Sequence, residues 1–459
     1  MRTRIEPYRV KVVEPIPFTS IAERERALAA AHWNLFKIPA NLVTIDLLTD
    51  SGMTAMSAHQ WAGLLDGDEA YAGARSFLRF EQVVRTLTGY THVIPTHQGR
   101  AAERLLFEAM LKPGDVVPGN THFDTTHANL ERAGARAVNL PIAVARSPAV
   151  EHPFKGDIDL DALAETLARE RVPLVIITVT SNGVGGHPVS LANMQAVRAL
   201  CDKHGARLFL DAARFAENAW LVRERAVGLG ERSPRELARA FFDLADGCLM
   251  SAKKDGLVNI GGFLALRDSS LADTLRRDMV LGEGFPTYGG LAGRDLEAMA
   301  SGLEEVTAPA YLADRIAQVR SLGDRLHAAG VPVMRPTGGH AVYLDSRAFA
   351  PHLGPLDLPG QAIVCALYRL AGIRSCEIGQ LMKGHSGPGG TPEGPVDLDL
   401  VRLAIPRRVY TCCHLDYVAE AVELLWAARS ELTAFEITEQ PPALRHFGAK
   451  LRPRAPRAS

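Results

Sequence analysis

Short runs of consecutive apolar residues alternate with helical hydrophobic patterns between about residue 45 and residue 307. The clearest runs cover residues 172–180, 206–211 and 247–250. Strands that are apolar along almost their whole length and are separated by helices are typical of a parallel sheet with helices on both faces. This region is therefore predicted to be an α/β domain.

The hydrophobic pattern changes near residue 308. Helices are predicted there at residues 311–329 and 361–371, and strands at residues 331–334, 341–344 and 401–405. This arrangement indicates a smaller α+β domain, which the N-terminal segment is expected to join. The predicted division is residues 1–45 for the N-terminal arm and part of the small domain, 46–307 for the large domain, and 308–459 for the small C-terminal domain.

Two segments are predicted to be irregular. Residues 384–395 are rich in glycine and proline, which indicates a loop. Residues 452–459 form a basic tail that is expected to fray.

Polar residues at the ends of two apolar runs indicate a cofactor site. Asp211 ends one run, and about forty residues later Ser251, Lys253 and Lys254 follow another. An acid at a strand end can keep a pyridine nitrogen protonated, and a lysine can form a Schiff base with an aldehyde, which together are what pyridoxal phosphate (PLP) requires. Asp211 is the candidate for the ring nitrogen, Lys254 for the aldehyde carbon, and Ser251 and Lys253 for the phosphate.

Each of these features has a simpler explanation on its own. An acid after an apolar run is often a strand end or a helix cap, and adjacent lysines are often a solvated turn. The order and spacing of the two features favour the cofactor.

A predicted helix start supplies the rest of a phosphate site. Gln98, Gly99 and Arg100 open a helical pattern. Backbone N–H groups at a helix N-terminus, together with an arginine, can bind a phosphate group. The same sequence can occur as an ordinary helix start, so the assignment depends on Lys254.

Three further residues are candidates for contact with the pyridine ring. Phe123 could stack on the ring, although core packing is the alternative. Asn182, just after residues 172–180, could reach the 3-oxygen of the ring together with Arg214. Turn formation and surface pairing are the alternatives for these two.

Composition changes this picture little. The 459-residue chain has 47% hydrophobic and 22% charged residues, which is ordinary for a globular enzyme. A formal net charge of -1 gives no general attraction to nucleic acid or to an anionic membrane, so small-molecule partners are expected. No apolar stretch reaches the roughly 18 residues of a membrane span, and the first residues lack the apolar core of a signal peptide. The cysteines have no disulfide-framework or zinc spacing, and the chain is expected to be cytoplasmic.

Eight segments of the chain, including those above, resemble the β-eliminating lyase family. The resemblance extends from about residue 8 to residue 451. The segments are residues 44–52, 67–76, 94–100, 185–193, 211–218, 251–255, 283–290 and 402–407.

The resemblance implies a fold and an assembly. It implies an α/β, fold-type-I PLP-dependent, aminotransferase-like subunit with a mainly parallel seven-stranded sheet in the large domain. It also implies a homotetramer with active sites shared between subunits, and activation by a monovalent cation such as potassium.

The resemblance also implies roles for single residues. Lys254 would be the Schiff-base lysine, Tyr71 a proton donor contributed across a subunit interface, and Arg402 the group that binds the substrate carboxylate. Thr49 and Ser51 would line the site.

The cation site would involve three more positions, Gly52, Glu69 and Asn259. Carbonyl and carboxylate oxygens are suitable ligands for such a hard cation.

Three pocket positions bear on the choice between tryptophan and tyrosine, the two substrates of the family. Where tyrosine-cleaving members have an arginine that binds the phenol oxygen, this chain has Ile378. Asp124 and His446 match the tryptophan-cleaving members. A buried arginine without an acceptor is costly, so its absence disfavours phenol recognition.

The sequence therefore predicts PLP-dependent cleavage of L-tryptophan to indole, pyruvate and ammonia. Lys254 would act as the general base, and Tyr71 with Asp124 and His446 would supply or position the acid that protonates indole. Asn182, Ile378, Arg402 and His446 would contact the substrate.

Two alternatives stay open at this point. Cleavage of L-tyrosine to phenol is the first, because residues 111–114, 291–297 and 401–410 resemble the tyrosine-cleaving members more closely. A catalytically silent PLP-binding protein is the second, although the presence of Lys254, Tyr71 and Arg402 together argues against it.

Overall fold

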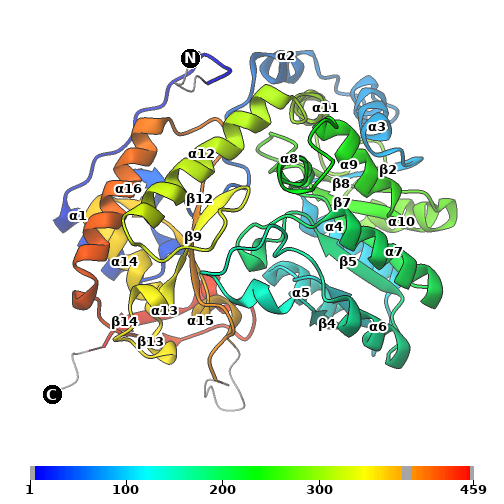
Figure 1. Ribbon diagram of the computed structural model, residues 1–459. Coiled ribbons are helices and arrows are strands. Elements are labelled where there is room, and N and C mark those ends of the chain that lie inside the picture. The colour runs from blue at the N-terminus through cyan, green and yellow to red at the C-terminus, as the bar shows by residue number, and fades with distance from the viewer. Residues whose placement is uncertain (1–5, 385–393, 455–459) are drawn as a thin grey trace.

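A seven-stranded sheet organises the larger part of the molecule in the computed structural model, which describes residues 6–384 and 394–454 (Figure 1). The strand order is β2-β8-β7-β6-β5-β3-β4. The bounds are β2 His92–Thr96, β3 Val116–Gly119, β4 Arg136–Asn139, β5 Leu174–Thr178, β6 Arg207–Asp211, β7 Gly247–Ser251 and β8 Gly262–Leu266. Only β8 runs antiparallel to its neighbours in this sheet. The predicted mainly parallel seven-stranded sheet is confirmed.

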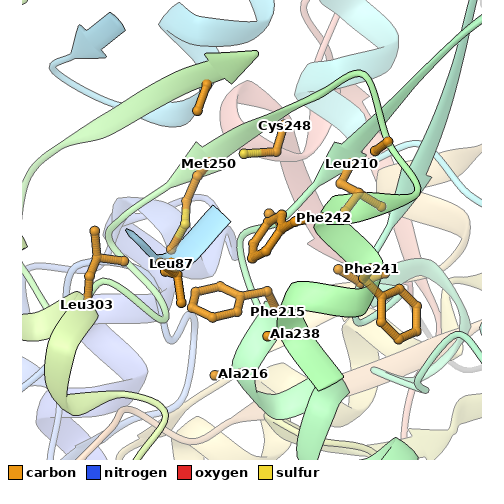
Figure 2. Close-up of a cluster of buried hydrophobic side chains, with 14 of the residues drawn as sticks. Leu87, Leu210, Phe215, Ala216, Ala238, Phe241, Phe242, Cys248, Met250 and Leu303 are labelled. Atoms are coloured by element: carbon orange, nitrogen blue, oxygen red, sulfur yellow. The ribbon is translucent and has the colours of Figure 1, made fainter. Parts of the chain in front are cut away.

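Helices cover both faces of this sheet. Successive side chains of a strand point to opposite faces, so Leu208 and Leu210 belong to one apolar core and Phe209 to the other. Figure 2 shows part of the first core, where Phe215 and Phe242 lie near Leu210 and Met250.

The helices of the larger part fall into two groups. Residues of α4 Gly99–Met110, α5 Asp124–Arg132 and α10 Ser269–Gly282 contribute to the core that contains Phe209. The core that contains Leu208 includes residues of α3 Arg75–Thr88, α6 Leu160–Arg169, α7 Leu191–His204, α8 Phe215–Arg225, α9 Pro234–Asp243 and α11 Gly293–Glu305. The short α2 Ala58–Asp66 contacts α11.

A second, smaller layer of structure forms around another core. Its main sheet has the order β11-β12-β9, all antiparallel, and β13 pairs with β14. The strands are β9 Ala341–Asp345, β10 Ile373–Arg374, β11 Cys376–Ile378, β12 Leu400–Ala404, β13 Phe435–Glu439 and β14 Lys450–Pro453, and the helices are α13 Ser346–Phe349, α14 Pro359–Ala371, α15 Gln380–Lys383, α16 Cys412–Ala427 and α17 Arg445–Gly448.

The N-terminal segment contributes to this smaller core. Helix α1 Ile21–Ala30 supplies Leu28, and strand β1 Ile45–Asp46 pairs with β10. The N-terminal segment and the C-terminal third of the chain therefore share one core.

One long helix belongs to both parts of the molecule. Helix α12 Pro309–Ala328 contributes Leu312 and Ile316 to the core of the large sheet, and Leu322 and Leu326 to the smaller core. The helix begins where the sequence pattern changes, but its packing spans that border (Figure 1).

Most of the predicted Gly/Pro-rich loop, residues 385–393, and the tail residues 455–459 lie outside the described residues. Within the described part, no helix has both the length and the apolar character to cross a membrane.

Candidate active site

The carboxyl ends of three neighbouring parallel strands meet at one edge of the large sheet. Thr178 of β5 lies opposite Asp211 of β6, which lies opposite Leu249 of β7. Ser251 ends β7, and Asn182 follows β5 in a short 3-10 turn, Asn182–Val184. Open α/β sheets bind ligands at such carboxyl ends.

Lys254 lies in the loop after β7 and is half-buried. Burial and the charges of Arg214 and Lys253, against the opposite effect of Asp50 and Asp211, lower the pKa of its amine to about 8. An amine with this pKa is partly unprotonated near neutral pH. It can therefore serve as a nucleophile toward an aldehyde or as a proton acceptor.

The carboxyl group of Asp211 is poorly hydrated and lies near the charge of Lys254. Burial raises the pKa of its carboxyl group, while the charge of Lys254 and the N–H of Ala213, which donates to Oδ1 at 3.2 Å, lower it. A buried carboxylate is stabilised by a cationic partner. A protonated pyridine nitrogen fits this position.

The predicted phosphate residues converge on the start of α4. Gln98 is the N-cap and Gly99 the first residue of the helix. A Cβ atom on Gly99 would lie 2.6 Å from Cβ of Ser251, so only glycine allows this close approach. The end of β7 and the free N–H groups of α4 are thereby brought together.

Two cations adjoin this helix start. Burial lowers the pKa of the Lys253 amine, and the charge of Arg100 lowers it further. The first turn of α4 contains no acidic residue. Helix N–H groups beside two like charges make a site that an anion would stabilise, so the residues present fit the phosphate of PLP.

Phe123, Asp124, Asn182 and Ile378 line one cavity of about 920 Å³. Phe123 is the N-cap of α5 and Asp124 its first residue, whereas Ile378 ends β11 of the smaller sheet. The cavity therefore lies between the two parts of the molecule. Ile378 is almost fully buried and gives it an apolar wall.

The structure brings His446 and Asp124 together although they are distant in sequence. Nε2 of His446 lies 2.8 Å from Oδ2 of Asp124, and both side chains are buried. His446 belongs to α17, and its ring packs against Phe36 and Phe447. At this distance the two groups attract each other when the imidazole is protonated, but their orientation is not that of a hydrogen bond.

Asn182 is the centre of a buried polar group. Its Oδ1 accepts hydrogen bonds from the Tyr343 hydroxyl at 2.6 Å and from Nη1 of Arg402 at 3.1 Å, and Nε2 of His340 lies 3.0 Å away. Burial lowers the pKa of His340 well below its ordinary value, so that ring is neutral. Neither Tyr343 nor His340 was predicted from the sequence.

Arg402 has unused hydrogen-bonding capacity. Its second terminal nitrogen donates to the Leu48 carbonyl at 2.9 Å, and its buried Nε has no hydrogen-bond partner among the residues that the structure describes. Within the described residues no carboxylate pairs with it. A buried guanidinium of this kind is suited to bind a substrate carboxylate.

Arg214 is held by a residue that the sequence analysis did not identify. It donates to the buried Asp50 through Nε at 3.0 Å and through Nη2 at 2.7 Å. This pairing engages the side of the guanidinium that includes Nε. Its contact with the 3-oxygen of the ring stays a prediction.

The other predicted residues near the N-terminal loop are placed together in part. Oγ1 of Thr49 accepts the N–H of Ser51 at 3.1 Å, and the N–H of Gly52 donates to the Lys253 carbonyl at 2.8 Å. Nδ2 of Asn259 donates to the Gly52 carbonyl at 2.9 Å. This loop therefore lies against the loop that contains Lys254.

Two predicted residues lie apart from this group. Glu69 is exposed. Tyr71 is 70% exposed, and of the described residues its ring contacts Phe285 and Tyr288, with centroid distances of 5.5 and 5.4 Å. A role for either residue in one subunit alone is not supported by this geometry.

Glu103 is a buried acid that the sequence analysis left without a role. Its carboxylate accepts hydrogen bonds from Thr126 at 2.5 Å and Asn129 at 3.0 Å, which joins α4 to α5. Burial and the charge of Asp211 raise its pKa to about 7, against the opposite effect of the two hydrogen bonds and of Lys254. Its position on the apolar face of the helix, with Ala102 and Leu106, was the signal in the sequence.

Comparison with known proteins gives close relatives. The family model for beta-eliminating lyase matches residues 46–421. A tryptophanase from Salinibacter ruber is 56% identical over 460 residues, which cover 100% of this chain and 97% of the relative. A tryptophanase from Hyphomonas neptunium is 53% identical over 98% of this chain and 99% of the relative. A tyrosine phenol-lyase from Symbiobacterium sp. is 47% identical over 98% of this chain and 98% of the relative.

Solved structures share the fold at low sequence identity. Serine palmitoyltransferase from Sphingomonas wittichii matches with a TM-score of 0.59 and 18% identity, over 90% of this chain and 97% of that chain. Serine palmitoyltransferase from S. paucimobilis with bound PLP and myriocin matches with a TM-score of 0.58 and 15% identity, over 89% and 97%. The predicted fold class, that of fold-type-I PLP-dependent enzymes, is confirmed.

Proposed function

Since the chain belongs to the β-eliminating lyase family, we propose that it converts L-tryptophan and water into indole, pyruvate and ammonia with PLP as cofactor. The family supports the lyase activity and the cofactor. The choice of tryptophan is supported by the residues of the cavity between the two parts of the molecule.

Residues at the sheet edge would hold the cofactor. Gln98, Gly99, Arg100, Ser251 and Lys253 would bind its phosphate through the helix N-terminus and two positive charges. Asp211 would keep the ring nitrogen protonated, and Phe123 would cover the ring. When bound, PLP supplies an electron sink that stabilises negative charge at the substrate Cα.

Lys254 would remove the proton from the substrate Cα. Its lowered pKa, about 8, leaves a useful fraction of the amine unprotonated near neutral pH. Arg402, with Asn182 beside it, would bind the substrate carboxylate and so hold the Cα–H bond toward Lys254.

The Asp124–His446 pair is the observation on which the choice of tryptophan depends. Indole leaves only after its C3 has gained a proton, so an acid must be held beside the ring. The pair at 2.8 Å lies where Asp124 and the apolar Ile378 line the same cavity. His446 and Asp124 would hold that proton, together with Tyr71 of a neighbouring subunit, while Ile378 would exclude water from the ring.

A direct assay tests this proposal. The purified protein with PLP is incubated separately with L-tryptophan and L-tyrosine, and indole and phenol are measured. Indole should form much faster, because a phenol oxygen buried beside Ile378 would lose about 1–3 kcal/mol of solvation without a partner. Faster release of phenol would support the tyrosine phenol-lyase alternative, to which relatives at 47% identity belong. Absence of both products would support a catalytically silent protein.

The proposal includes a cation and a shared assembly. A potassium ion would bind near the Gly52 carbonyl and Asn259, with Glu69 completing the site. Tyr71 would reach the site of another subunit in a homotetramer, and its exposure in the single chain supports this role.

A further inference from the structure

Four segments that resemble the family each contain a buried charged residue without an assigned role. The segments are residues 44–52, 211–218, 251–255 and 402–407, and the residues are Asp50, Glu217, Asp255 and Arg407. All four side chains are fully buried. The structure brings them into one cluster.

Arg407 is the centre of this cluster. Its Nη1 donates to Oδ2 of Asp50 at 2.9 Å, and its Nη2 donates to Oε1 of Glu217 at 2.8 Å and to Oδ1 of Asp255 at 2.9 Å. Arg407 follows β12 of the smaller sheet, whereas Glu217 lies on α8 and Asp255 follows β7. One guanidinium therefore joins the two parts of the molecule.

Two further arginines balance the charge of the cluster. Arg214 pairs with Asp50, and Arg315 of α12 donates to Glu217 at 3.0 Å. Three arginines thus face three carboxylates. Buried charges are tolerated when they are paired and hydrogen-bonded, and the loss of one partner leaves an uncompensated buried charge.

The cluster holds the residue next to Lys254. Oδ2 of Asp255 accepts the N–H groups of Ala216 at 2.8 Å and Glu217 at 3.3 Å, and the N–H of Asp255 donates to the Ala213 carbonyl at 3.2 Å. Asp255 is therefore fixed to α8 by one oxygen and to Arg407 by the other. The direction of the loop at Lys254 depends on this fixation.

Charges of the cluster also act on the amine of Lys254. Although burial acts to raise it, the charges of Arg214 and Arg407 hold the pKa of Asp50 well below its usual range. Asp50 and Arg214 are among the charges that act on Lys254, together with Asp211 and Lys253. A change in the net charge of the cluster should therefore change how strongly the Lys254 nitrogen holds its proton.

We propose that Arg407 is a positioning residue that fixes the Lys254 loop against the smaller part of the molecule and keeps the charge beside Lys254 balanced. The inference rests on the proposed role of Lys254 as the lysine that binds PLP. It assigns to Arg407 no contact with substrate or cofactor.

Two charge variants test the inference. The absorption band of the lysine-bound cofactor is titrated with pH in the holoenzyme of wild type, Arg407→Gln and Glu217→Gln. Arg407→Gln leaves one excess negative charge, which favours the proton on the Lys254 nitrogen, so the midpoint pH should rise by up to about one unit. Glu217→Gln leaves one excess positive charge, so the midpoint should fall by a similar amount.

Control variants separate charge and position from general damage. Arg408→Gln removes the adjacent arginine, which pairs across the same border with Glu305 at 3.0 Å but does not contact the cluster, and its midpoint should equal that of wild type. Arg407→Lys keeps the charge and should bring the midpoint back toward wild type. If Arg407→Gln does not fold, the downward shift in Glu217→Gln decides the question.

The outcomes distinguish this inference from the proposed function. Unchanged midpoints, or shifts of the same sign in Arg407→Gln and Glu217→Gln, would overturn the role of Arg407 while the band itself persists. Persistence of the band in Lys254→Ala would instead overturn the proposed role of Lys254.

Discussion

Lys254 and Lys253 are adjacent in sequence, but the structure gives them different surroundings. Lys254 lies among Arg214, Asp50 and Asp211, whereas Lys253 lies near Arg100 at the start of α4. The first environment suits covalent attachment and proton transfer, and the second suits binding of a phosphate. Two substitutions can separate these roles.

Lys254→Ala should remove the absorption band of the lysine-bound cofactor and lower turnover by roughly 10²–10⁴-fold, the range for loss of a general base. Lys253→Ala should keep the band and bind the cofactor less tightly. Absorption spectra and cofactor titrations of the two variants provide the measurement. Loss of the band in Lys253→Ala alone would reverse the assignment.

His446→Phe should slow tryptophan cleavage by roughly 10²-fold, because the carboxylate of Asp124 would lose the imidazole that lies beside it. An alanine with a good leaving group at Cβ requires no ring protonation, so its cleavage should change little. The ratio of kcat/KM for the two substrates isolates this effect. An equal loss on both substrates would show that His446 only supports the fold.

Single residues were predictable to different degrees. Asp211, Lys254 and Ser251 follow or end apolar runs, and this local pattern is enough to predict that they lie at a sheet edge. Asp124 and His446 came only from family resemblance, because no local pattern relates two residues so far apart. The partner of Arg214, Asp50, was not predicted, since a buried ion pair leaves no periodic signal in either segment.

At the scale of elements, the link between α4 and α5 matters for the site because α5 begins at Asp124 and is preceded by Phe123. Glu103 forms this link through Thr126 and Asn129. Burial favours its protonated form in the folded chain, with a pKa of about 7 against an ordinary value of 4.5. The folded state therefore binds this proton more tightly than the unfolded state.

Wild-type protein without cofactor should lose about 2–3 kcal/mol of stability from this group as the pH rises from 4.5 through about 7, because the folded carboxyl must then ionise. Glu103→Gln should not show this loss. Thermal unfolding midpoints of both proteins between pH 5 and 8 measure the difference, with Glu108→Gln, an exposed position on the same helix, as the control. A constant difference across this pH range would contradict the assignment.

Elements were predicted best where local pattern and packing agree. The runs at residues 172–180, 206–211 and 247–250 became β5, β6 and β7, because parallel strands covered on both faces are apolar throughout. The insertion of β8 antiparallel between β7 and β2 was not predicted, because strand direction is decided by the connections and not by composition. Strands β10 and β11 are too short to show a two-residue hydrophobic period in the sequence.

At the scale of the whole molecule, the exposure of Tyr71 in the single chain links the proposed activity to the assembly of subunits. If Tyr71 serves the site of a neighbouring subunit, each site takes Lys254 from one subunit and Tyr71 from the other. The Tyr71→Phe and Lys254→Ala variants are then each inactive, but a hybrid of the two has one site in which both residues are intact. Subunits that are unfolded and refolded together should regain roughly a quarter of wild-type activity, because half of the pairs are hybrids with one intact site. Activity no greater than the sum of the separate variants would contradict a shared site.

Potassium should raise the activity of the holoenzyme over sodium, because the loop at Gly52 lies against the Lys253 carbonyl and a bound cation would order both loops. Initial rates in the two chlorides at equal ionic strength provide the measurement. Asn259→Ala should reduce the difference. Equal rates in both salts would contradict a cation at this position.

Helix α12 has a consequence for recombination between relatives. Residue 308 is the natural crossover point by sequence pattern, yet Leu312 and Ile316 on one side of the helix centre, and Leu322 and Leu326 on the other, complete two different cores. A chimaera joined at residue 308 would place a foreign first half of α12 against the native large core. The better crossover point for exchange between homologous proteins therefore lies inside the helix. It is near residue 317, where the helix passes from one core to the other.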